Sequence, residues 1–276
     1  MKTNGLNTLL LILIVFGLSV CRPKQTTEIR DDFKRYYDQF NVEGSFALYD
    51  PQTDKYTFYN QAQFKQEFSP ASTFKICNSL IGLETGVIKD ENFLIPWDSV
   101  IRNPVWDKDH DMKTAFANST VWYYQELARR VGGQQMKYWL NKANYGNADT
   151  LGGIDQFWLD GGLRISPEQQ ITFLKRLHDN KLPFSQRSID IVKKIMITKD
   201  TLNYIVRGKT GWGADGNNDV GWYVGYLETK NGTYYFSNCV QIDSKKFADV
   251  NYAISFDNSR MEIVYKILAD LKLTPE

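Results

Sequence analysis

The chain has 276 residues, of which 42% are hydrophobic and 14% aromatic, which suits one large or two small globular domains with a substantial core. Its 33 lysines and arginines nearly balance 32 aspartates and glutamates, leaving a formal net charge of +1 and no long run of one sign. This balance argues against nucleic acid as a partner and favours small neutral or singly charged molecules.

The first 21 residues differ in character from the rest of the chain. Lys2 precedes the apolar stretch LLLILIVFGLSV (Leu9 to Val20), which is too short to span a bilayer but has the length of a secretory signal core. We therefore expect export to the periplasm of a Gram-negative bacterium, with an uncleaved anchor or an interior helix as the alternative. Cys21 after LSV resembles a lipoprotein cleavage site, although Val20 departs from the usual small residue. If the segment is cleaved as a signal, a lipid on Cys21 is the membrane attachment that we expect.

After the signal segment, the sequence predicts a helix followed by two strands. The charged stretch EIRDDFKRYYDQF (28–40) is predicted to be a helix, and GSFALYDPQTDKYTFYN (44–60) to be two strands around the turn at Asp50-Pro51. The middle, from about Ser69 to Lys194, is expected to be mostly helical, with long connections between its helices.

The last third of the chain has strand patterns at 201–211, 219–229 and 232–242, followed by a helix at 259–271 with Ile263, Ile267 and Leu271 on one stripe. Asn231-Gly232 between two strand patterns indicates a hairpin. We therefore predict a single α+β domain at 22–276. Its antiparallel sheet is built from both chain ends and flanked by the N- and C-terminal helices, and a helical lobe at about 69–194 leaves the active site in the cleft between them.

Ser72 and Lys75 stand out at the start of the helical lobe. Ser69-Pro70 is predicted to begin a helix, with Ser69 as its cap, so that Ser72 lies in the first turn and Lys75 one turn further on the same face. The helix is apolar nearly all round, and a buried ammonium is costly. Ser and Lys at this spacing would form a nucleophile pair, but S-x-x-K is expected by chance about once in a chain of this length.

Further polar residues make this pair more significant. Lys209-Thr210-Gly211 follows a strand pattern, and such a triplet is expected by chance in fewer than about one in ten such chains. Lysine and threonine supply a charge and a hydroxyl to hold a carboxylate, and glycine lets a substrate approach the backbone. Ser119 offers a second hydroxyl from the helical lobe. Arg260 opens the terminal helix and is expected to lie against this strand, or else to be a solvated surface arginine.

In this order, the motifs resemble those of the serine β-lactamases and penicillin-binding proteins, and in detail those of the class D, oxacillinase-type β-lactamases. The matching segments are STFK (72–75), STV (119–121), YGN (145–147), FWLDGGLRIS (157–166), KTGWG (209–213) and NSR (258–260). Val121 stands where the class A middle motif has an asparagine, and no glutamate of the class A type can be assigned.

The resemblance implies hydrolysis of a small-molecule β-lactam by a monomer or homodimer, with N-carboxylated Lys75 as general base. It implies no metal and no cofactor beyond carbon dioxide or bicarbonate. Val121 makes the surroundings of Lys75 drier than an amide would, which lowers the lysine pKa and favours the neutral amine that adds carbon dioxide. Trp158 is implied to donate its indole N–H to the carbamate, and Phe74, Val121 and Leu159 to form apolar walls.

The resemblance also implies the remaining roles in catalysis. Ser72 attacks the β-lactam carbonyl, and the same carbamate serves acylation and deacylation. Ser119 passes a proton to the ring nitrogen with electrostatic help from Lys209. The other roles are an oxyanion hole from the backbone N–H groups of Ser72 and Trp212, close approach of substrate at Gly211, and carboxylate binding by Thr210 and Arg260.

Three alternatives remain open at this stage. A transpeptidase or the drug-sensing domain of a receptor would share the acylation but deacylate slowly. With 7 tryptophans and 16 tyrosines, a non-catalytic carbohydrate- or peptide-binding lipoprotein is a second reading. The third is a metal enzyme, since Asp107, Asp109 and Asp111 alternate as at the start of a calcium-binding loop. The segment lacks the glycine and the glutamate that such a loop has at its sixth and twelfth positions. His110 and His178 are the only histidines in the sequence, which makes a zinc site poorly supplied with ligands.

Cys77 and Cys239 lack the spacing of a metal or redox motif. We predict that both pack as small hydrophobes in the core, and a disulfide between them stays open.

Overall fold

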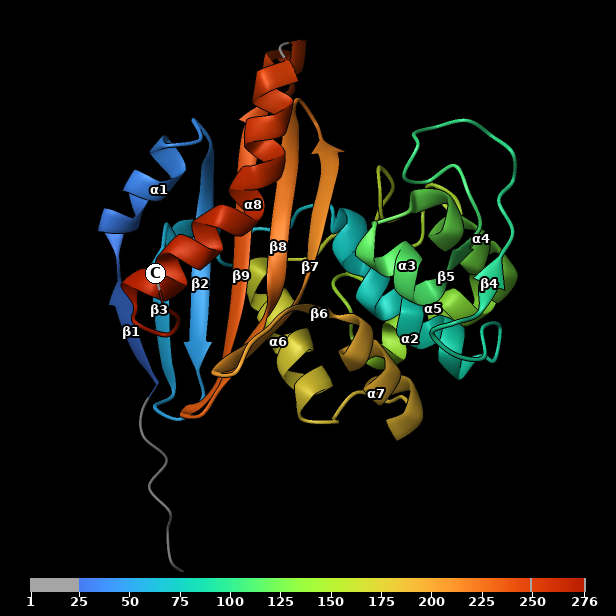
Figure 1. The fold of residues 1–276 in the computed structure, drawn as a ribbon, viewed down its shortest axis with the longest axis horizontal. Coiled ribbons are helices and arrows are strands. Elements are labelled where there is room, and N and C mark those ends of the chain that lie inside the picture. Colours follow the sequence, from blue (N-terminus) through green and yellow to red (C-terminus); the bar gives the residue numbers. More distant parts are fainter. Residues whose placement is uncertain (1–24, 249, 276) are drawn as a thin grey trace, which may run out of the picture.

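The computed structural model describes residues 25–248 and 250–275 and shows the predicted α+β fold (Figure 1). The expected signal segment at 1–21, with Cys21, lies outside the described residues. Among the helices that the structure does describe, none combines the length and the apolar character needed to cross a bilayer.

The largest element is a seven-stranded sheet with the order β1-β3-β2-β9-β8-β7-β6. Its strands are β1 (Thr26–Ile29), β2 (Glu43–Asp50), β3 (Lys55–Tyr59), β6 (Ile197–Asp200), β7 (Tyr204–Asp215), β8 (Asn218–Thr229) and β9 (Gly232–Asp243). All neighbours are antiparallel except β1 and β3, which are parallel. Pairing of β2 with β9 joins the two ends of the chain, which confirms that the sheet is built from both.

The hairpin between β8 and β9 confirms the prediction from Asn231-Gly232. Thr229 pairs with Gly232, so Lys230 and Asn231 form the two-residue loop. The side chains of β8 alternate between two cores: Trp222 packs with the helical lobe, and Tyr223 packs with the terminal helices.

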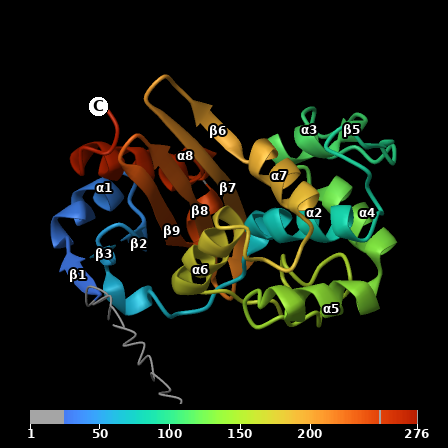
Figure 2. The same cartoon turned by 90° about the horizontal axis from the view of Figure 1, so that it is seen from below.

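Helices cover both faces of the sheet. On one face lie α1 (Lys34–Asp38) and α8 (Val250–Asp270), and on the opposite face lies α6 (Pro167–His178) (Figures 1 and 2). The first core, under α1 and α8, includes Phe33, Phe236, Phe256 and Ile263, all of which are fully buried. The second core fills the space between the sheet, α6 and the helical lobe.

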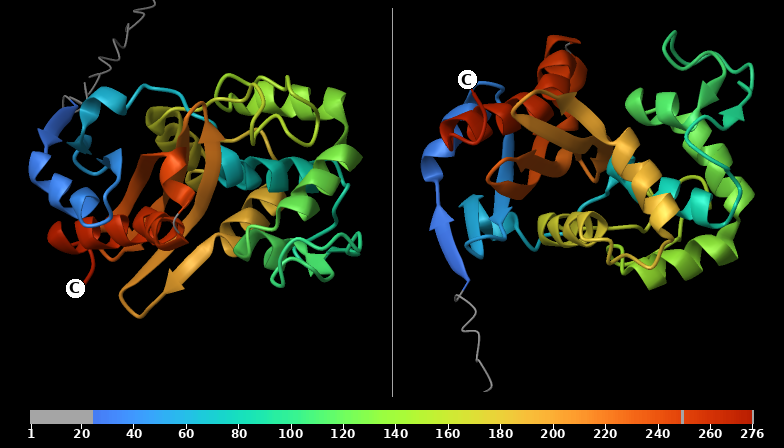
Figure 3. Two further views of the ribbon diagram at one scale, coloured as in Figure 1. Left: turned by 90° about the horizontal axis from the view of Figure 1, so that it is seen from above. Right: turned by 60° about the horizontal axis from the view of Figure 1, so that its bottom comes forward.

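The helical lobe stands beside the β7 side of the sheet (Figure 3). Its members are α2 (Lys75–Glu84), α3 (Met112–Ala117), α4 (Val121–Val131), α5 (Gly133–Ala143) and α7 (Gln186–Ile195), with the short strands β4 (Leu94–Ile95) and β5 (His110–Asp111). Helix α2 is buried along almost its whole length, because its residues are apolar on nearly every side. Gly86 follows the end of this helix with a φ of +72°, a backbone conformation that glycine adopts without strain.

Two boundaries were predicted wrongly. The segment 28–40 is not one helix, because Thr26–Ile29 pairs with β3 as a strand, and a 3-10 turn (η1, Asp31–Phe33) precedes α1. The terminal helix begins at Val250 rather than at residue 259, so Arg260 lies in its middle instead of opening it. For β1, the decisive pairing partner lies in another segment of the chain, Lys55–Phe58.

Candidate active site

The predicted cap at Ser69 was wrong. Pro70 is the cap residue of the following turn and no side chain of the described residues accepts the N–H groups of that turn, while the Ser69 hydroxyl donates to the backbone carbonyls of Leu159 at 2.8 Å and Trp158 at 3.1 Å. The chain enters α2 through a 3-10 turn at Ala71–Phe74 (η3), and Ala71 has a φ of +46°. Ser72 therefore lies in a tight turn whose backbone is strained at the residue before it.

Strand β7 runs against this turn, and Gly211 makes the close approach between them. A Cβ atom at Gly211 would lie 3.0 Å from the carbonyl oxygen of Pro70 and 3.1 Å from Cγ2 of Thr73. These distances are shorter than ordinary van der Waals contact. The glycine of the K-T-G motif is thus required by the packing of the strand on the turn that carries Ser72.

Ser72 and Lys75 form a buried pair. Nζ of Lys75 donates to Oγ of Ser72 at 2.7 Å, and Lys75 is only 1% exposed. Nζ also lies 5.3 Å above the centre of the Tyr124 ring. No carboxylate in the described parts of the chain forms an ion pair with Lys75. Burial lowers the pKa of Lys75 to about 7, which makes the neutral amine abundant near neutral pH.

Ser119 and Lys209 connect the helical lobe to the sheet. Ser119 lies between α3 and α4 with a φ of +55°, and its Oγ accepts a hydrogen bond from Nζ of Lys209 at 3.0 Å. Nζ of Lys209 also donates to the carbonyl and the hydroxyl of Thr210, at 3.1 and 3.2 Å. Burial, and then the nearby charges of Lys75 and Arg260, hold the pKa of Lys209 well below its usual value.

Arg260 lies against β7, as predicted. Its Nη1 donates to the carbonyl of Gly211 at 3.0 Å, and its Nε donates to the carbonyl of Asp257 at 3.0 Å. Nη2 forms an ion pair with the Asp257 carboxylate. The guanidinium carbon lies 5.8 Å from the centre of the Trp212 ring, so the arginine is fixed at the strand that carries Thr210.

Trp158 is fully buried, and its indole N–H has no hydrogen-bond partner among the described residues. The ring of Phe74, the residue before Lys75, packs on the Trp158 ring with the two centroids 5.3 Å apart. Val121 begins α4 and lines the cavity described below. Leu159 is half-buried, packs against the core that contains Phe74 and Trp158, and accepts the Ser69 hydroxyl on its carbonyl.

The segment that carries Trp158 is fixed by the other predicted motifs. The side-chain oxygen of Asn147, in the YGN motif, accepts the backbone N–H of Arg164 at 3.0 Å. Its side-chain NH₂ donates to the backbone carbonyl of Gly162 at 2.9 Å. Phe68 and Ile165 exchange backbone hydrogen bonds of 3.0 and 2.9 Å. These bonds hold the 157–166 segment against the chain just before the Ser72 turn.

A cavity of about 660 Å³ lies where these residues meet. Residues predicted for the site that line it are Ser72, Ser119, Val121, Thr210, Trp212 and Arg260. Sequence reasoning missed Trp106, Asn118, Asp219 and Asp257, which also line it. Trp106 lies outside the motifs that the sequence analysis assigned to the site, and neither aspartate belongs to a motif, so the sequence held no signal for them.

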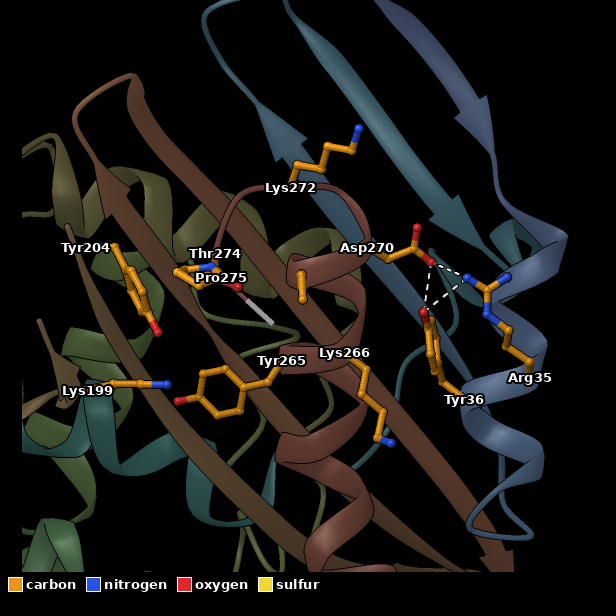
Figure 4. A pocket seen from close by; sticks show the side chains of 11 residues that line it. Arg35, Tyr36, Lys199, Tyr204, Tyr265, Lys266, Asp270, Lys272, Thr274 and Pro275 are labelled. Carbon is orange, nitrogen blue, oxygen red and sulfur yellow. Dashed lines mark hydrogen bonds and ion pairs between the residues drawn. The ribbon is translucent and has the colours of Figure 1, made fainter.

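A second hollow, of about 690 Å³, lies near the end of α8. Figure 4 shows its lining side chains, including Lys199, Tyr204, Tyr265 and Lys266, and the carboxylate of Asp270 near Arg35 and Tyr36. Its lining contains neither the Ser72–Lys75 pair nor the K-T-G residues. The smaller cavity is therefore the candidate active site.

The aspartates of the proposed calcium loop organise their own backbone. Asp107, Asp109 and Asp111 accept the N–H groups of Arg102 at 2.9 Å, Trp97 at 2.8 Å and Thr114 at 2.7 Å, respectively. Their carboxylates therefore serve turns and a helix cap.

Cys77 and Cys239 are free thiols buried in the core, which confirms their predicted packing and excludes a disulfide between them. Burial raises the pKa of each thiol, as expected for an unreactive cysteine.

Comparisons with known proteins identify related chains. The family described as "Penicillin binding protein transpeptidase domain" matches residues 44–267. The chain is 40% identical over 227 residues to "Probable beta-lactamase YbxI" of Bacillus subtilis, covering 82% of each chain.

Two solved structures share the fold over most of the chain. The class D beta-lactamase from Sebaldella termitidis superposes with a TM-score of 0.84 at 34% identity, covering 91% of this chain and 99% of that one. The C-terminal domain of the Bacillus licheniformis BlaR penicillin-receptor gives 0.83 at 32% identity, covering 92% and 100%. The similarity thus extends to both enzymes and a receptor domain.

Proposed function

Because this chain belongs to the class D β-lactamases, within the penicillin-binding-protein transpeptidase family, we propose that it hydrolyses β-lactams through an acyl-enzyme on Ser72 with N-carboxylated Lys75 as general base. The observation that carries the proposal is the buried Lys75 amine, 2.7 Å from Oγ of Ser72 and without a carboxylate partner in the described residues.

The first chemical step prepares the base. The neutral Lys75 amine adds carbon dioxide, forming an N–C bond and releasing one proton, and the product is an anionic carbamate. A pKa near 7 leaves much of the amine neutral and able to react. The unpartnered indole N–H of Trp158, beside Phe74, is a suitable donor for a carbamate oxygen.

Acylation follows from the positions of the hydroxyls. Carboxylated Lys75 takes the proton of Ser72 as Oγ bonds to the β-lactam carbonyl carbon, and the backbone N–H groups of Ser72 and Trp212 stabilise the oxyanion. The ring C–N bond then breaks, and Ser119, held by Lys209 at 3.0 Å, gives its proton to the leaving nitrogen and receives in its place the proton that carboxylated Lys75 took from Ser72, so that the carbamate is anionic again. Thr210 and Arg260 hold the substrate carboxylate at the other end of the cavity.

Deacylation uses the same base. Carboxylated Lys75 takes a proton from water, which attacks the ester carbonyl and releases Ser72 with its proton restored. One base for both half-reactions explains how the chain works without a separate catalytic glutamate.

A receptor-like function is the second candidate, since the BlaR domain shares the fold. Both functions acylate Ser72, and only the enzyme deacylates rapidly. Nitrocefin turnover separates them: we expect many cycles per protein molecule, whereas one stoichiometric burst would identify a receptor or transpeptidase.

We also propose that residues 1–21 direct export to the periplasm, with lipidation of Cys21 as the form of membrane attachment. Intact mass spectrometry of the protein recovered from cells tests this. A mature chain that begins at Cys21 and carries diacylglycerol supports it, and a chain that retains Met1 in the cytoplasm contradicts it.

A further inference from the structure

A carboxylate stands at the rim of the active-site cavity, beside the arginine proposed to hold substrate. Asp257 lies one turn before Arg260 on α8 and forms an ion pair with Nη2 of that arginine. The Asp257 side chain is 55% exposed, whereas that of Arg260 is 9% exposed. Asp257 is thus accessible to a ligand in the cavity that it helps to line.

The cavity holds little positive charge to balance its carboxylates. A second one, Asp219, also lines it and accepts the indole N–H of Trp212 at 2.6 Å. Among the described residues, Arg260 is the one cationic side chain that lines this cavity, whereas Lys209 does not line it and is hydrogen-bonded to Ser119 and Thr210. When a substrate carboxylate reaches Arg260, two carboxylates share one guanidinium, and the surplus charge beside Asp257 is negative.

The chemistry of cephalosporins places substituents at this point. Their carboxylate is on a ring carbon directly bonded to the carbon that carries the 3′ substituent. If Arg260 and Thr210 bind the carboxylate, the 3′ substituent is held close to Arg260 and therefore close to Asp257, its ion-pair partner. A cation there offsets the surplus charge, and an anion or a neutral group does not.

We propose that Asp257 determines substrate specificity, favouring β-lactams that carry a cationic group next to the recognised carboxylate. The proposal rests on the proposed function, because it takes its orientation of substrate from Arg260. Since Asp257 is half exposed, water and salt weaken the attraction, and we expect a preference of about 3- to 5-fold.

Cephaloridine and cephalothin form a matched pair of probes. They share the thienylacetyl side chain and differ only at the 3′ position, with a pyridinium in the first and an acetoxy group in the second. We expect Asp257→Asn, which keeps the shape of the side chain, to lower the ratio of kcat/KM for cephaloridine to that for cephalothin about 3- to 5-fold, mainly through KM. Raising the salt concentration should move the wild-type ratio toward that of the variant.

Asp190→Asn is the charge-matched control, since Asp190 is exposed on α7 and away from the cavity. We expect it to leave the ratio unchanged. If Asp257→Asn lowers both substrates equally, Asp257 merely positions Arg260, and the proposal is overturned. An unchanged or increased ratio overturns it as well.

The same ratio can be measured on acylation alone, by following the mass of the Ser72 adduct. This measurement separates the proposed hydrolytic function from the proposed role of Asp257. If turnover fails but the acylation ratio still falls in Asp257→Asn, only the hydrolytic function is lost; if neither cephalosporin acylates the wild type, the proposed function and the Asp257 proposal both fail.

Discussion

The pKa of Lys75 is lowered by burial rather than by a neighbouring charge. Desolvation is the cause of its lowered pKa, and the nearest groups are the Ser72 hydroxyl and the Tyr124 ring. Within residues 25–248 and 250–275, no carboxylate forms an ion pair with this side chain that would offset the burial of an ammonium. Burial favours the neutral amine, and the neutral amine is the form that reacts with carbon dioxide.

Replacing Lys75 by methionine tests the free-energy cost of burying an ammonium at this position. The folded pKa lies near 7 and the unfolded pKa near 10.4, so wild-type stability rises with pH between these values, where the unfolded chain binds more protons. Below pH 7 both states are protonated, and the full cost of burial remains. We expect Lys75→Met to be more stable than wild type at pH 6, by at least about 1 kcal/mol, with the gap shrinking toward pH 10.

Urea unfolding at several pH values measures this difference. β-Lactamase activity should fall at least about 100-fold in the same variant, because the general base is lost. A constant stability gap from pH 6 to pH 10 would contradict the assigned state of Lys75.

Trp158 gives a second prediction at this scale. Trp158→Phe keeps most of the ring volume but removes the indole N–H that has no partner in the described structure. We expect the carbamate to be less stable, so that turnover falls about 10- to 100-fold and recovers partly when bicarbonate is added. Assays with and without bicarbonate provide the measurement, and Trp139→Phe, at a half-buried position of α5, is the control. Equal activity of Trp158→Phe and wild type in bicarbonate-free buffer would exclude this role.

At the scale of elements, the contact between β7 and the η3 turn sets the distance between strand and nucleophile. Gly211→Ala would place a methyl group 3.0 Å from the Pro70 carbonyl, which is backbone and cannot rotate away. We expect a loss of about 1–3 kcal/mol in stability and at least a 10-fold loss in kcat/KM as the strand moves.

Gly133→Ala is the matched control, because nothing lies within 4 Å of its added Cβ at the start of α5. It should leave activity unchanged and stability equal or slightly higher. Thermal melts and nitrocefin assays of the two variants test the contact. If Gly211→Ala behaves like Gly133→Ala, the turn and the strand are not in the close contact described.

The elements also show where sequence reasoning succeeds. The β8–β9 hairpin was predicted because its signal, Asn231-Gly232 between alternating residues, is local. The Thr26–Ile29 strand was missed because its partner, Lys55–Phe58, lies in another segment and the charges that follow favour a helix. The cap predicted at Ser69 was wrong because the carbonyls that accept its hydroxyl are about 90 residues away in the sequence, where local reasoning does not reach.

At the scale of the whole molecule, the active site is the junction of two bodies. Ser72 and Ser119 come from the helical lobe, and Lys209 and Arg260 come from the sheet and its covering helix. The Lys209–Ser119 hydrogen bond crosses the junction directly. The motifs were predicted because their residue types and order are distinctive, whereas Trp106, Asp219 and Asp257 reach the cavity only through folding.

The most direct test of this account is carbon-13 NMR of the protein supplied with labelled bicarbonate, recorded while nitrocefin turnover is assayed on the same sample. We predict a carbamate resonance that is present in the active wild type, absent in Lys75→Met, and lost together with activity as pH falls through about 7. Full turnover without that resonance would show that another group takes the proton of Ser72, and would contradict the account.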